Sequence, residues 1–284
     1  MTQRTAIVTG AAGGLGRALA QALIERGSNL VVVDSDSSVE DLTSGRADQV
    51  LARVADVTDD SQLTALVADA VDRFGSIDLC INNAGRVDYA PMDLDAAQAA
   101  DIFESLWRVN TRACYMLGRL VIPHMIEAQH GHLINISTDH VHTCGYPNAL
   151  PHEDSSSCPW ASAPRRPLGG DAFDAYDASK WALNGMTQVW SQALKRHGIR
   201  VNNICLGATD TPMIRQAMTD LRGTPPTPDD IAGWMKPDEI ADLILELHDE
   251  GPSGRTGDNV GIWVGHPVTL PPAHPVLDRS HRVR

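Results

Sequence analysis

The chain has 284 residues, of which 43% are hydrophobic and 21% are charged. This composition is that of a globular protein and excludes a disordered one, and the length suits one large domain or two small ones. The formal net charge of −13 excludes binding to nucleic acid or an anionic membrane by overall electrostatic attraction, because both need a positive surface.

Short apolar segments alternate along the chain with longer segments of helical periodicity. The apolar segments predict buried strands at residues 6–8, 30–33, 50–54, 79–81, 133–136, 201–205 and 260–264. The periodic segments predict helices at 15–26, 61–74, 96–128, 178–196 and 237–248. Strands that are apolar on both faces and alternate with helices are typical of a parallel sheet. The sequence therefore predicts an α/β fold with a single doubly wound, Rossmann-like parallel sheet and helices on both faces.

No repeat and no sharp change of composition divides the chain before about residue 139, so we expect one domain over residues 1–265. Residues 139–175 form a long insert rich in Pro, Ser, His and Asp, without periodicity. Such a segment inside a compact domain is typical of a lid, a binding loop or disorder. Residues 266–284 form a polar, Pro-rich C-terminal tail.

Location and redox state follow from two further patterns. No apolar run reaches the roughly 18 residues of a membrane span, and no signal peptide precedes the first strand, so we expect a cytoplasmic protein. The five cysteines include no C-x-x-C pair, and three of them lie in apolar segments. Buried, reduced thiols are the simplest account, and a Cys144–Cys158 disulfide is the less favoured alternative.

A glycine-rich turn follows the first predicted strand, with Gly10, Gly14 and Gly16 in the segment TGAAGGLG. Glycine lets a pyrophosphate approach the backbone, and the helix that begins near Leu15 supplies free N–H groups and the positive end of its dipole. The spacing differs from G-x-G-x-x-G, since Leu19 stands where the last glycine is required. By itself this turn is equally compatible with a purely structural role.

Asp34 ends the second predicted strand, 18 residues after Gly16. A carboxylate at that place accepts hydrogen bonds from ribose hydroxyls and repels a 2′-phosphate. Neither Ser35 nor Asp36 is basic, so the sequence favours NAD over NADP. The alternative is that Asp34 only caps a turn.

Tyr176 and Lys180 stand four residues apart, which places them on one face of a helix. An ammonium beside a phenol stabilises the phenolate and lowers the tyrosine pKa from about 10. The pair is therefore a candidate general acid or base for chemistry near neutral pH. The alternative is a surface tyrosine beside a helical lysine.

The glycine turn, Asp34 and Tyr176-x-x-x-Lys180 together resemble the short-chain dehydrogenase/reductase family, over about residues 4–265. Further motifs of that family follow in order. Asp56-Val57 is similar to the pair that contacts adenine, and Asn82-Asn83-Ala84-Gly85 is similar to the N-N-A-G motif along the cofactor. Asn110 matches the asparagine that holds a relay water. The segment with Gly207, Thr209 and Thr211 is similar to the one near the nicotinamide carboxamide.

The resemblance implies hydride transfer between NAD and the carbon of a small secondary alcohol or ketone. Tyr176 is then the general base for oxidation or the general acid for reduction, and Lys180 lowers its pKa and binds the nicotinamide ribose. The register of the fifth strand gives the role of the catalytic hydroxyl to Thr138, with Ser137 as the fallback. The resemblance also implies a substrate loop at about 208–235 and a homo-oligomer, either a dimer or a tetramer.

Departures from the family pattern leave alternatives open. Thr138 and Tyr176 are 38 residues apart (176 − 138), more than the family norm, and Leu206-Gly207 replaces the usual Pro-Gly. The segment after Ser137 resembles the extended branch, which includes sugar and sugar-nucleotide epimerases and dehydratases that retain NAD. Asn83-Ala84-Gly85 favours the shorter branch. A non-catalytic NAD-binding module is a third hypothesis, disfavoured by the complete set of catalytic residues.

A metal site is the remaining alternative. Asp139, His140, His142, Cys144 and His152 are residue types that bind metals, but no second cluster at a fixed ligand spacing accompanies them. We expect no metal and a small-molecule substrate as the only partner besides a second copy of the chain.

Overall fold

The computed structural model describes residues 4–141, 172–265, 267–271 and 273. Its strands form one seven-stranded sheet in the order β3-β2-β1-β4-β5-β6-β7, and every neighbouring pair is parallel. The predicted single doubly wound sheet is confirmed. The strands are β1 (Thr5–Thr9), β2 (Asn29–Asp34), β3 (Val50–Val54), β4 (Leu79–Asn82), β5 (Gly131–Thr138), β6 (Ile199–Leu206) and β7 (Asn259–Ile262).

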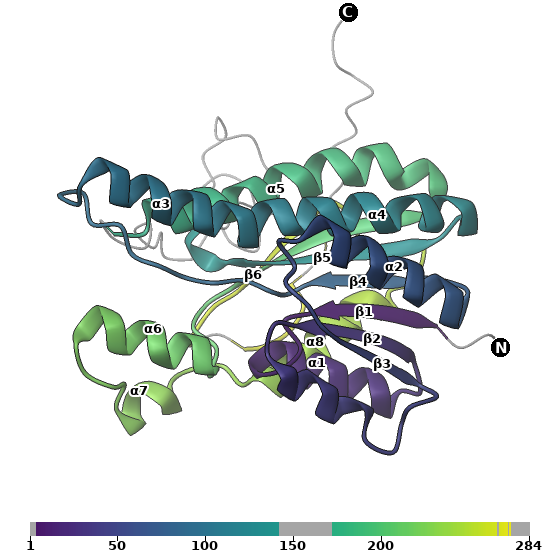
Figure 1. The fold of residues 1–284 in the computed structure, drawn as a ribbon, viewed down its shortest axis with the longest axis horizontal. Helices are drawn as coiled ribbons and strands as arrows, with labels where there is room; N and C mark the ends of the chain where they lie inside the picture. Colours follow the sequence, from purple (N-terminus) through teal and green to yellow (C-terminus); the bar gives the residue numbers. More distant parts are fainter. Residues whose placement is uncertain (1–3, 142–171, 266, 272, 274–284) are drawn as a thin grey trace, which may run out of the picture.

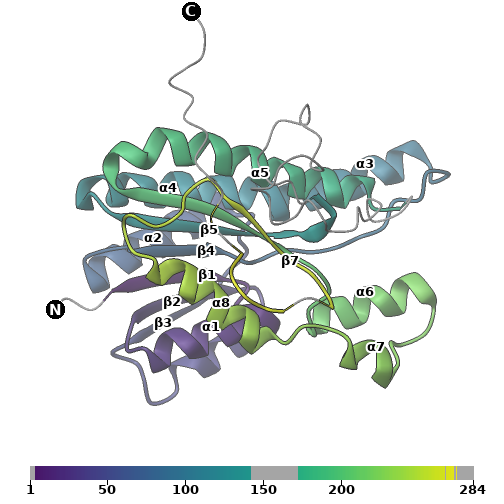
Figure 2. The same ribbon diagram turned by 180° about the vertical axis from the view of Figure 1, so that it is seen from behind.

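Helices cover both faces of the sheet, as Figures 1 and 2 show. One face packs against α1 (Gly14–Glu25) and α8 (Pro237–Asp249), and the other against α2 (Asp60–Phe74), α4 (Ala113–Ala128) and α5 (Asp174–Leu194). Each face has its own apolar core. Both cores draw on the β-branched runs in the strands, because side chains alternate between the two faces of a strand.

The prediction of a single helix at 96–128 is wrong in one respect. The structure contains α3 (Ala96–Trp107), a π-helical turn η2 (Arg108–Arg112) and then α4. A π turn inserts one extra residue into a helix and often occurs at functional sites. Here it lies at Asn110, whose side chain is held by the backbone of Arg86, so the bulge gives this amide a tertiary partner.

The predicted substrate loop at 208–235 contains two helices, α6 (Pro212–Arg222) and α7 (Pro228–Ala232). Each begins with a threonine N-cap followed by proline, a start signal that the sequence carries at Thr211 and Thr227. Both helices stand apart from the layers that cover the sheet (Figures 1 and 2). Short 3-10 turns that the periodicity did not predict are η1 (Ser37–Thr43), η3 (Asp139–Val141) and η5 (Lys195–His197).

Helix α5 begins at Asp174, earlier than the expected residue 178, so Tyr176 lies within its first turn. The ends of the predicted insert therefore belong to η3 and α5, and residues 142–171 lie outside the described part of the chain. In the predicted tail, Val268 and Leu270 pack against the core. Among the described residues, no helix is both long enough and apolar enough to cross a membrane.

Candidate active site

Thr138 and Tyr176 meet at the carboxyl end of β5. Thr138 is the last residue of β5, Tyr176 lies in the first turn of α5, and the Thr138 hydroxyl lies near enough to the phenol to lower the pKa of Tyr176. The hydroxyl of Thr138 also accepts the backbone N–H of His140 at 3.4 Å. Ser137, the fallback for the catalytic hydroxyl, turns instead toward the carbonyl of Lys180 at 3.5 Å. The geometry thus places Thr138, and not Ser137, against the phenol.

The pKa of Tyr176 is raised, which is opposite to the direction expected from a neighbouring lysine. Burial is the largest cause, followed by the negative charge of Asp177; the hydrogen bond from Thr138 acts in the other direction. The charge of Asp139 raises the pKa further. Tyr176 is therefore a protonated phenol in this structure, suited to donate a proton to a substrate oxygen.

Lys180 lies one helical turn after Tyr176 and is buried. Its ammonium donates to the carbonyl of Ile136 at 3.0 Å and stands 5.9 Å from the centre of the Tyr176 ring. Burial lowers the pKa of Lys180. A methyl group added at Gly85 would lie 3.3 Å from this ammonium, so the segment that follows β4 approaches it closely.

Asn110 is fully buried on the same side of the sheet. Its amide nitrogen donates to the carbonyl of Arg86 at 2.9 Å and to the hydroxyl of Ser179 at 3.0 Å, and its oxygen accepts the N–H of Arg86. These bonds join the π turn to the segment after β4 and to the helix turn between Tyr176 and Lys180. Asn110 thus belongs to the same network as the tyrosine–lysine pair.

The glycine-rich turn has the geometry of a phosphate cradle. A Cβ at Gly16 would lie 1.9 Å from the carbonyl oxygen of Gly10, so α1 packs closer to β1 than any side chain allows. Gly10 and Gly14 have positive φ angles of 68° and 51°, which favour glycine. A Cβ at Gly13 would meet nothing within 4 Å among the described residues. No described side chain caps the N-terminus of α1, whose first turn contains Leu15. An uncapped helix N-terminus at this turn fits an anionic pyrophosphate.

The N-N-A-G segment ties β4 to this turn. Asn83 donates its side-chain amide to the carbonyls of Thr9 and Gly10 at 2.9 and 3.1 Å. The backbone N–H groups of Asn83 and Ala84 donate to the hydroxyl of Thr9 at 3.0 and 2.9 Å. The segment therefore fixes the glycine turn in position.

Asp34 lies at the end of β2, beside the glycine turn. One carboxylate oxygen accepts the N–H of Ala12 at 2.9 Å and the other accepts the N–H of Asp36 at 3.1 Å. At the end of the neighbouring strand, the carboxylate of Asp56 accepts the N–H of Thr58 at 2.8 Å, and Val57 packs against the core. These residues lie at and just after the carboxyl ends of β2 and β3.

The segment after β6 closes the other side of the glycine turn. A Cβ at Gly207 would lie 3.0 Å from the carboxylate of Asp139, so this glycine allows β6 and η3 to approach. Thr209 bonds to the carbonyl of Gly207, and Thr211 caps α6. A Cβ on Gly14 would meet the side chain of Thr211 at 2.9 Å, which places the start of α6 beside the pyrophosphate cradle.

Aromatic rings that the sequence patterns did not single out form a wall beside Tyr176. Phe173 makes edge contacts with Tyr89 at 5.0 Å, with His140 at 5.3 Å and with Tyr176 at 6.2 Å between ring centres. Tyr89 donates to the carbonyl of Ala217 in α6 at 2.6 Å. The only sequence signal for Tyr89 was its place just after the N-N-A-G motif.

No group of three or more His, Cys, Asp or Glu side chains among the described residues is arranged to hold a metal ion. Of the residues considered for a metal, His142, Cys144 and His152 lie outside the described part of the chain. Cys158, considered as the disulfide partner of Cys144, lies outside it too. The described cysteines are buried free thiols: Cys80, Cys114 and Cys205.

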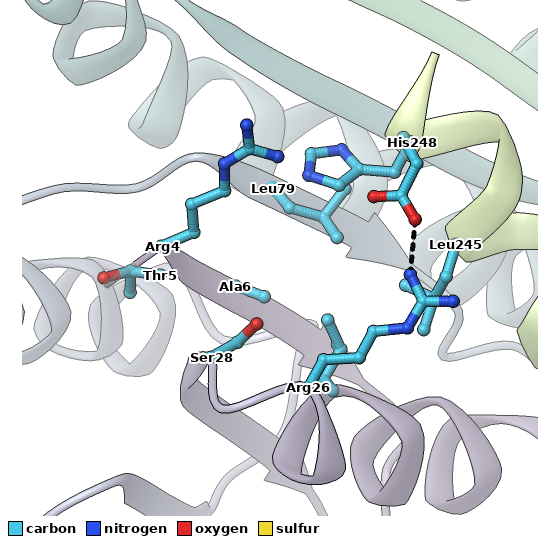
Figure 3. A pocket seen from close by; sticks show the side chains of 10 residues that line it. Arg4, Thr5, Ala6, Arg26, Ser28, Leu79, Leu245 and His248 are labelled. Carbon is cyan, nitrogen blue, oxygen red and sulfur yellow. Dashed lines mark hydrogen bonds and ion pairs between the residues drawn. The ribbon is translucent and has the colours of Figure 1, made fainter. Parts of the chain in front are cut away.

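A separate small pocket lies at the opposite edge of the sheet, at the start of β1 (Figure 3). Arg4, Arg26, Leu79 and His248 are among its lining residues, and Arg26 forms an ion pair with Asp249 at 2.7 Å. It contains none of the predicted site residues and is distinct from the site at the carboxyl ends of the strands.

The chain belongs to the short-chain dehydrogenase family, since the family model described as short chain dehydrogenase matches residues 4–148 and 168–222. It is therefore an oxidoreductase of a family that uses a nicotinamide cofactor. Neither the fold nor the relatives support the alternative of an epimerase or dehydratase.

Known proteins resemble the chain over nearly its whole length. It is 31% identical to an uncharacterized NAD-dependent oxidoreductase of Mycobacterium tuberculosis, over 92% of this chain and 95% of that protein. It is 29% identical to cis-4-hydroxycyclohexanecarboxylate dehydrogenase of Sinomonas cyclohexanicum, over 93% and 96%. The crystal structure of levodione reductase matches with a TM-score of 0.74 and 27% identity, over 92% and 96%.

Proposed function

We propose that this protein is an NAD-dependent dehydrogenase that transfers a hydride between NAD and the carbinol or carbonyl carbon of a small cyclic secondary alcohol or ketone. The observation that carries the proposal is that the Thr138 hydroxyl lies beside the Tyr176 phenol, with Lys180 one helical turn away and the glycine turn after β1, two strands from β5. A proton donor, a second hydroxyl and a cradle for a dinucleotide thus converge at one edge of the sheet.

The side chains divide the proton chemistry among them. In reduction, Tyr176 donates its phenol proton to the substrate oxygen; in oxidation, it takes the proton from the substrate hydroxyl. The hydroxyl of Thr138 donates a hydrogen bond to the same oxygen. Lys180 supplies a positive charge beside the phenol, and Asn110 anchors the helix turn that carries both residues through Ser179. The nicotinamide supplies or accepts the hydride when it is bound.

NAD is proposed over NADP because of the charges around Asp34. Its carboxylate stands at the place where a 2′-phosphate would lie, and an acidic residue there disfavours that phosphate. Arg17, the nearest cation in α1, donates to the carbonyl of Ala12 at 3.0 Å and is 4.0 Å from Asp41. The NAD-dependent relative from Mycobacterium tuberculosis is consistent with this choice.

The preference for a cyclic substrate rests on the aromatic wall. Tyr89 and Phe173 present ring surfaces near Tyr176, and flat or cyclic carbon skeletons pack favourably against such surfaces. Two relatives have cyclic compounds in their names, a hydroxycyclohexanecarboxylate and levodione.

A homo-oligomer is also proposed. Phe103 and Trp107 of α3 stack with their ring centres 5.8 Å apart, and both are exposed, as is Trp181 of the neighbouring α5. Exposed aromatic residues on adjacent helices are typical of a subunit interface. We expect Trp181→Glu to shift the protein toward a smaller species in mass photometry. The cytoplasmic location, with no membrane or nucleic-acid partner, stays a prediction.

The direct test is a screen of cyclic and acyclic secondary alcohols with NAD and NADP, followed by absorbance of the reduced cofactor. We expect NAD-dependent turnover that Tyr176→Phe lowers by about a hundred-fold or more. Full turnover by Tyr176→Phe would contradict the proposal. Cofactor binding by the variant, measured by calorimetry, separates a chemical defect from a folding defect.

A further inference from the structure

His140 and Asp177 form a polar pair beside the two reacting hydroxyls. The ring nitrogen Nδ1 of His140 and the carboxylate of Asp177 are 2.9 Å apart, and both side chains are largely buried, with 28% and 11% exposed. His140 lies in η3, two residues after Thr138, and Asp177 directly follows Tyr176 in α5. The pair therefore joins the same two elements that carry the Thr138 hydroxyl and the Tyr176 phenol.

Side-chain bonds join η3 directly to α5, which begins after 32 intervening residues (173 − 142 + 1). The His140–Asp177 pair is one, and the donation from the Asn184 amide to the carbonyl of Val141, at 2.7 Å, is another. Element η3 follows β5 without a gap, and β5 packs against α5. The two bonds therefore hold η3 against α5 at the place where the sheet brings these elements together.

His140 also acts on Thr138 and Tyr176 individually. Its backbone N–H donates to the hydroxyl oxygen of Thr138 at 3.4 Å, which leaves the hydroxyl proton of Thr138 available for another acceptor. Its ring presents an edge-on contact to Tyr176 at 6.2 Å between ring centres. A shift of His140 would change both the direction of the threonine hydroxyl and the packing of the phenol.

We propose that the His140–Asp177 pair is a positioning device that holds the Thr138 hydroxyl beside the Tyr176 phenol. This inference rests on the proposed function and deepens it, because it assigns a role in the reaction to two residues outside the tyrosine–lysine motif. Both are positioning residues: they act through the Thr138–Tyr176 contact. Asp177 adds a negative charge beside the phenol, together with Asp139, while Lys180 and Tyr89 are the other titratable groups around it.

A matched set of variants separates the hydrogen bond from the ring and from the charge. His140→Phe keeps an aromatic ring but removes the donor, whereas His140→Asn keeps a donor at the place of Nδ1 and removes the ring. Asp177→Ala removes the acceptor, and Asp177→Asn keeps an acceptor oxygen without the charge. Asp174→Asn is the control, since Asp174 is an exposed carboxylate in the same helix turn.

We expect His140→Phe and Asp177→Ala each to lower kcat by about ten- to a hundred-fold, the size typical of a small misplacement of reacting groups, with KM nearly unchanged. The double variant should lose no more than either single variant, because both remove the same bond. His140→Asn, Asp177→Asn and Asp174→Asn should keep most of the wild-type kcat. Multiplied losses in the double variant, or equal losses in His140→Phe and His140→Asn, would overturn the proposal.

A second measurement does not depend on turnover. The protein contains only four tyrosines, so the tyrosinate absorbance of Tyr176 can be obtained as the difference between each protein and its Tyr176→Phe counterpart. Asp177→Asn should shift this titration to lower pH, because it removes a negative charge beside the phenol, and Asp174→Asn should not. An unshifted titration in Asp177→Asn would contradict the position of the Asp177 charge beside the phenol. If the titration shifts but the wild-type protein shows no turnover, the proposed function is wrong and the position of Asp177 stands.

Discussion

The side chains of Thr138 and Tyr176 lie beside each other although the two residues are 38 positions (176 − 138) apart in the sequence. The contact arises because β5 ends at Thr138 and α5 begins just before Tyr176, with both ends at the carboxyl edge of the parallel sheet. Ligands of open α/β sheets bind outside this edge. The long insert between the two residues therefore does not prevent their meeting.

Replacement of Thr138 tests which hydroxyl serves the reaction. Thr138→Val keeps the shape of the side chain and removes the hydroxyl, so we expect kcat to fall by about a hundred-fold, the cost of losing one donor to a developing charge. Thr138→Ser should remain within a few-fold of the wild type in steady-state kinetics. A large loss in Ser137→Ala, with none in Thr138→Val, would transfer the role to Ser137.

Replacement of Asp34 tests the choice of cofactor. Asp34→Asn keeps an oxygen that can accept the N–H of Ala12 but removes the charge that repels a 2′-phosphate. We expect kcat/KM for NADP, divided by kcat/KM for NAD, to rise by about ten-fold or more. A change of that size is typical of gaining or losing one charged contact. An unchanged ratio would mean that Asp34 does not face the ribose.

Two glycines of the cradle provide a matched pair for a stability test. A Cβ at Gly16 would lie 1.9 Å from a backbone oxygen of Gly10, whereas a Cβ at Gly13 would meet nothing within 4 Å in the described part of the chain. Gly16→Ala should therefore destabilise the fold by about 2 kcal/mol or more, as overpacking does. Gly13→Ala should keep the wild-type melting temperature but weaken cofactor binding. Thermal melts and calorimetry distinguish the two, and equal melting temperatures would contradict the expected clash.

Acid should destabilise the fold through the buried histidine pair His132 and His248, of which His248 lines the pocket of Figure 3. Asn202 donates to Nε2 of His132, so Nδ1 of His132 carries the proton and donates to Nδ1 of His248, 3.3 Å away. Burial and the nearby charge of Arg200 lower the pKa of His248 to about 4, and burial also lowers that of His132. Both rings therefore stay neutral in the folded protein at pH values where the unfolded chain binds protons.

The unfolded chain takes up protons on histidine below about pH 6.5, so the free energy of unfolding should fall as the pH drops from 7 toward 4. His248 alone should account for about 2 kcal/mol between pH 7 and pH 5. Urea unfolding at several pH values measures the slope, and His248→Asn, which keeps a polar group without titrating, should reduce it. An equally steep slope in this variant would assign the acid sensitivity to other groups.

The local pattern of the sequence determined the sheet, the helices that cover it and the positions of the glycine turn, Asp34 and Tyr176. These features depend on neighbours in the chain: apolar runs, helical periodicity and glycines where the backbone must approach a ligand. The π turn at Asn110 was not predicted, because its partners, Arg86 and Ser179, lie far away in the sequence. The caps at Thr211 and Thr227 were visible signals that periodicity alone did not use.

Only the tertiary structure decided the electrical environment of the reacting tyrosine. The sequence indicated that Lys180 lowers the pKa of Tyr176, whereas burial, the largest cause, raises it, because desolvation depends on everything that surrounds a side chain and not only on a neighbour four residues away. The structure likewise placed Thr138, and not Ser137, against the phenol, since consecutive residues of a strand point to opposite faces of the sheet. The sequence thus determined which residues carry the chemistry, and long-range packing decided how they face one another.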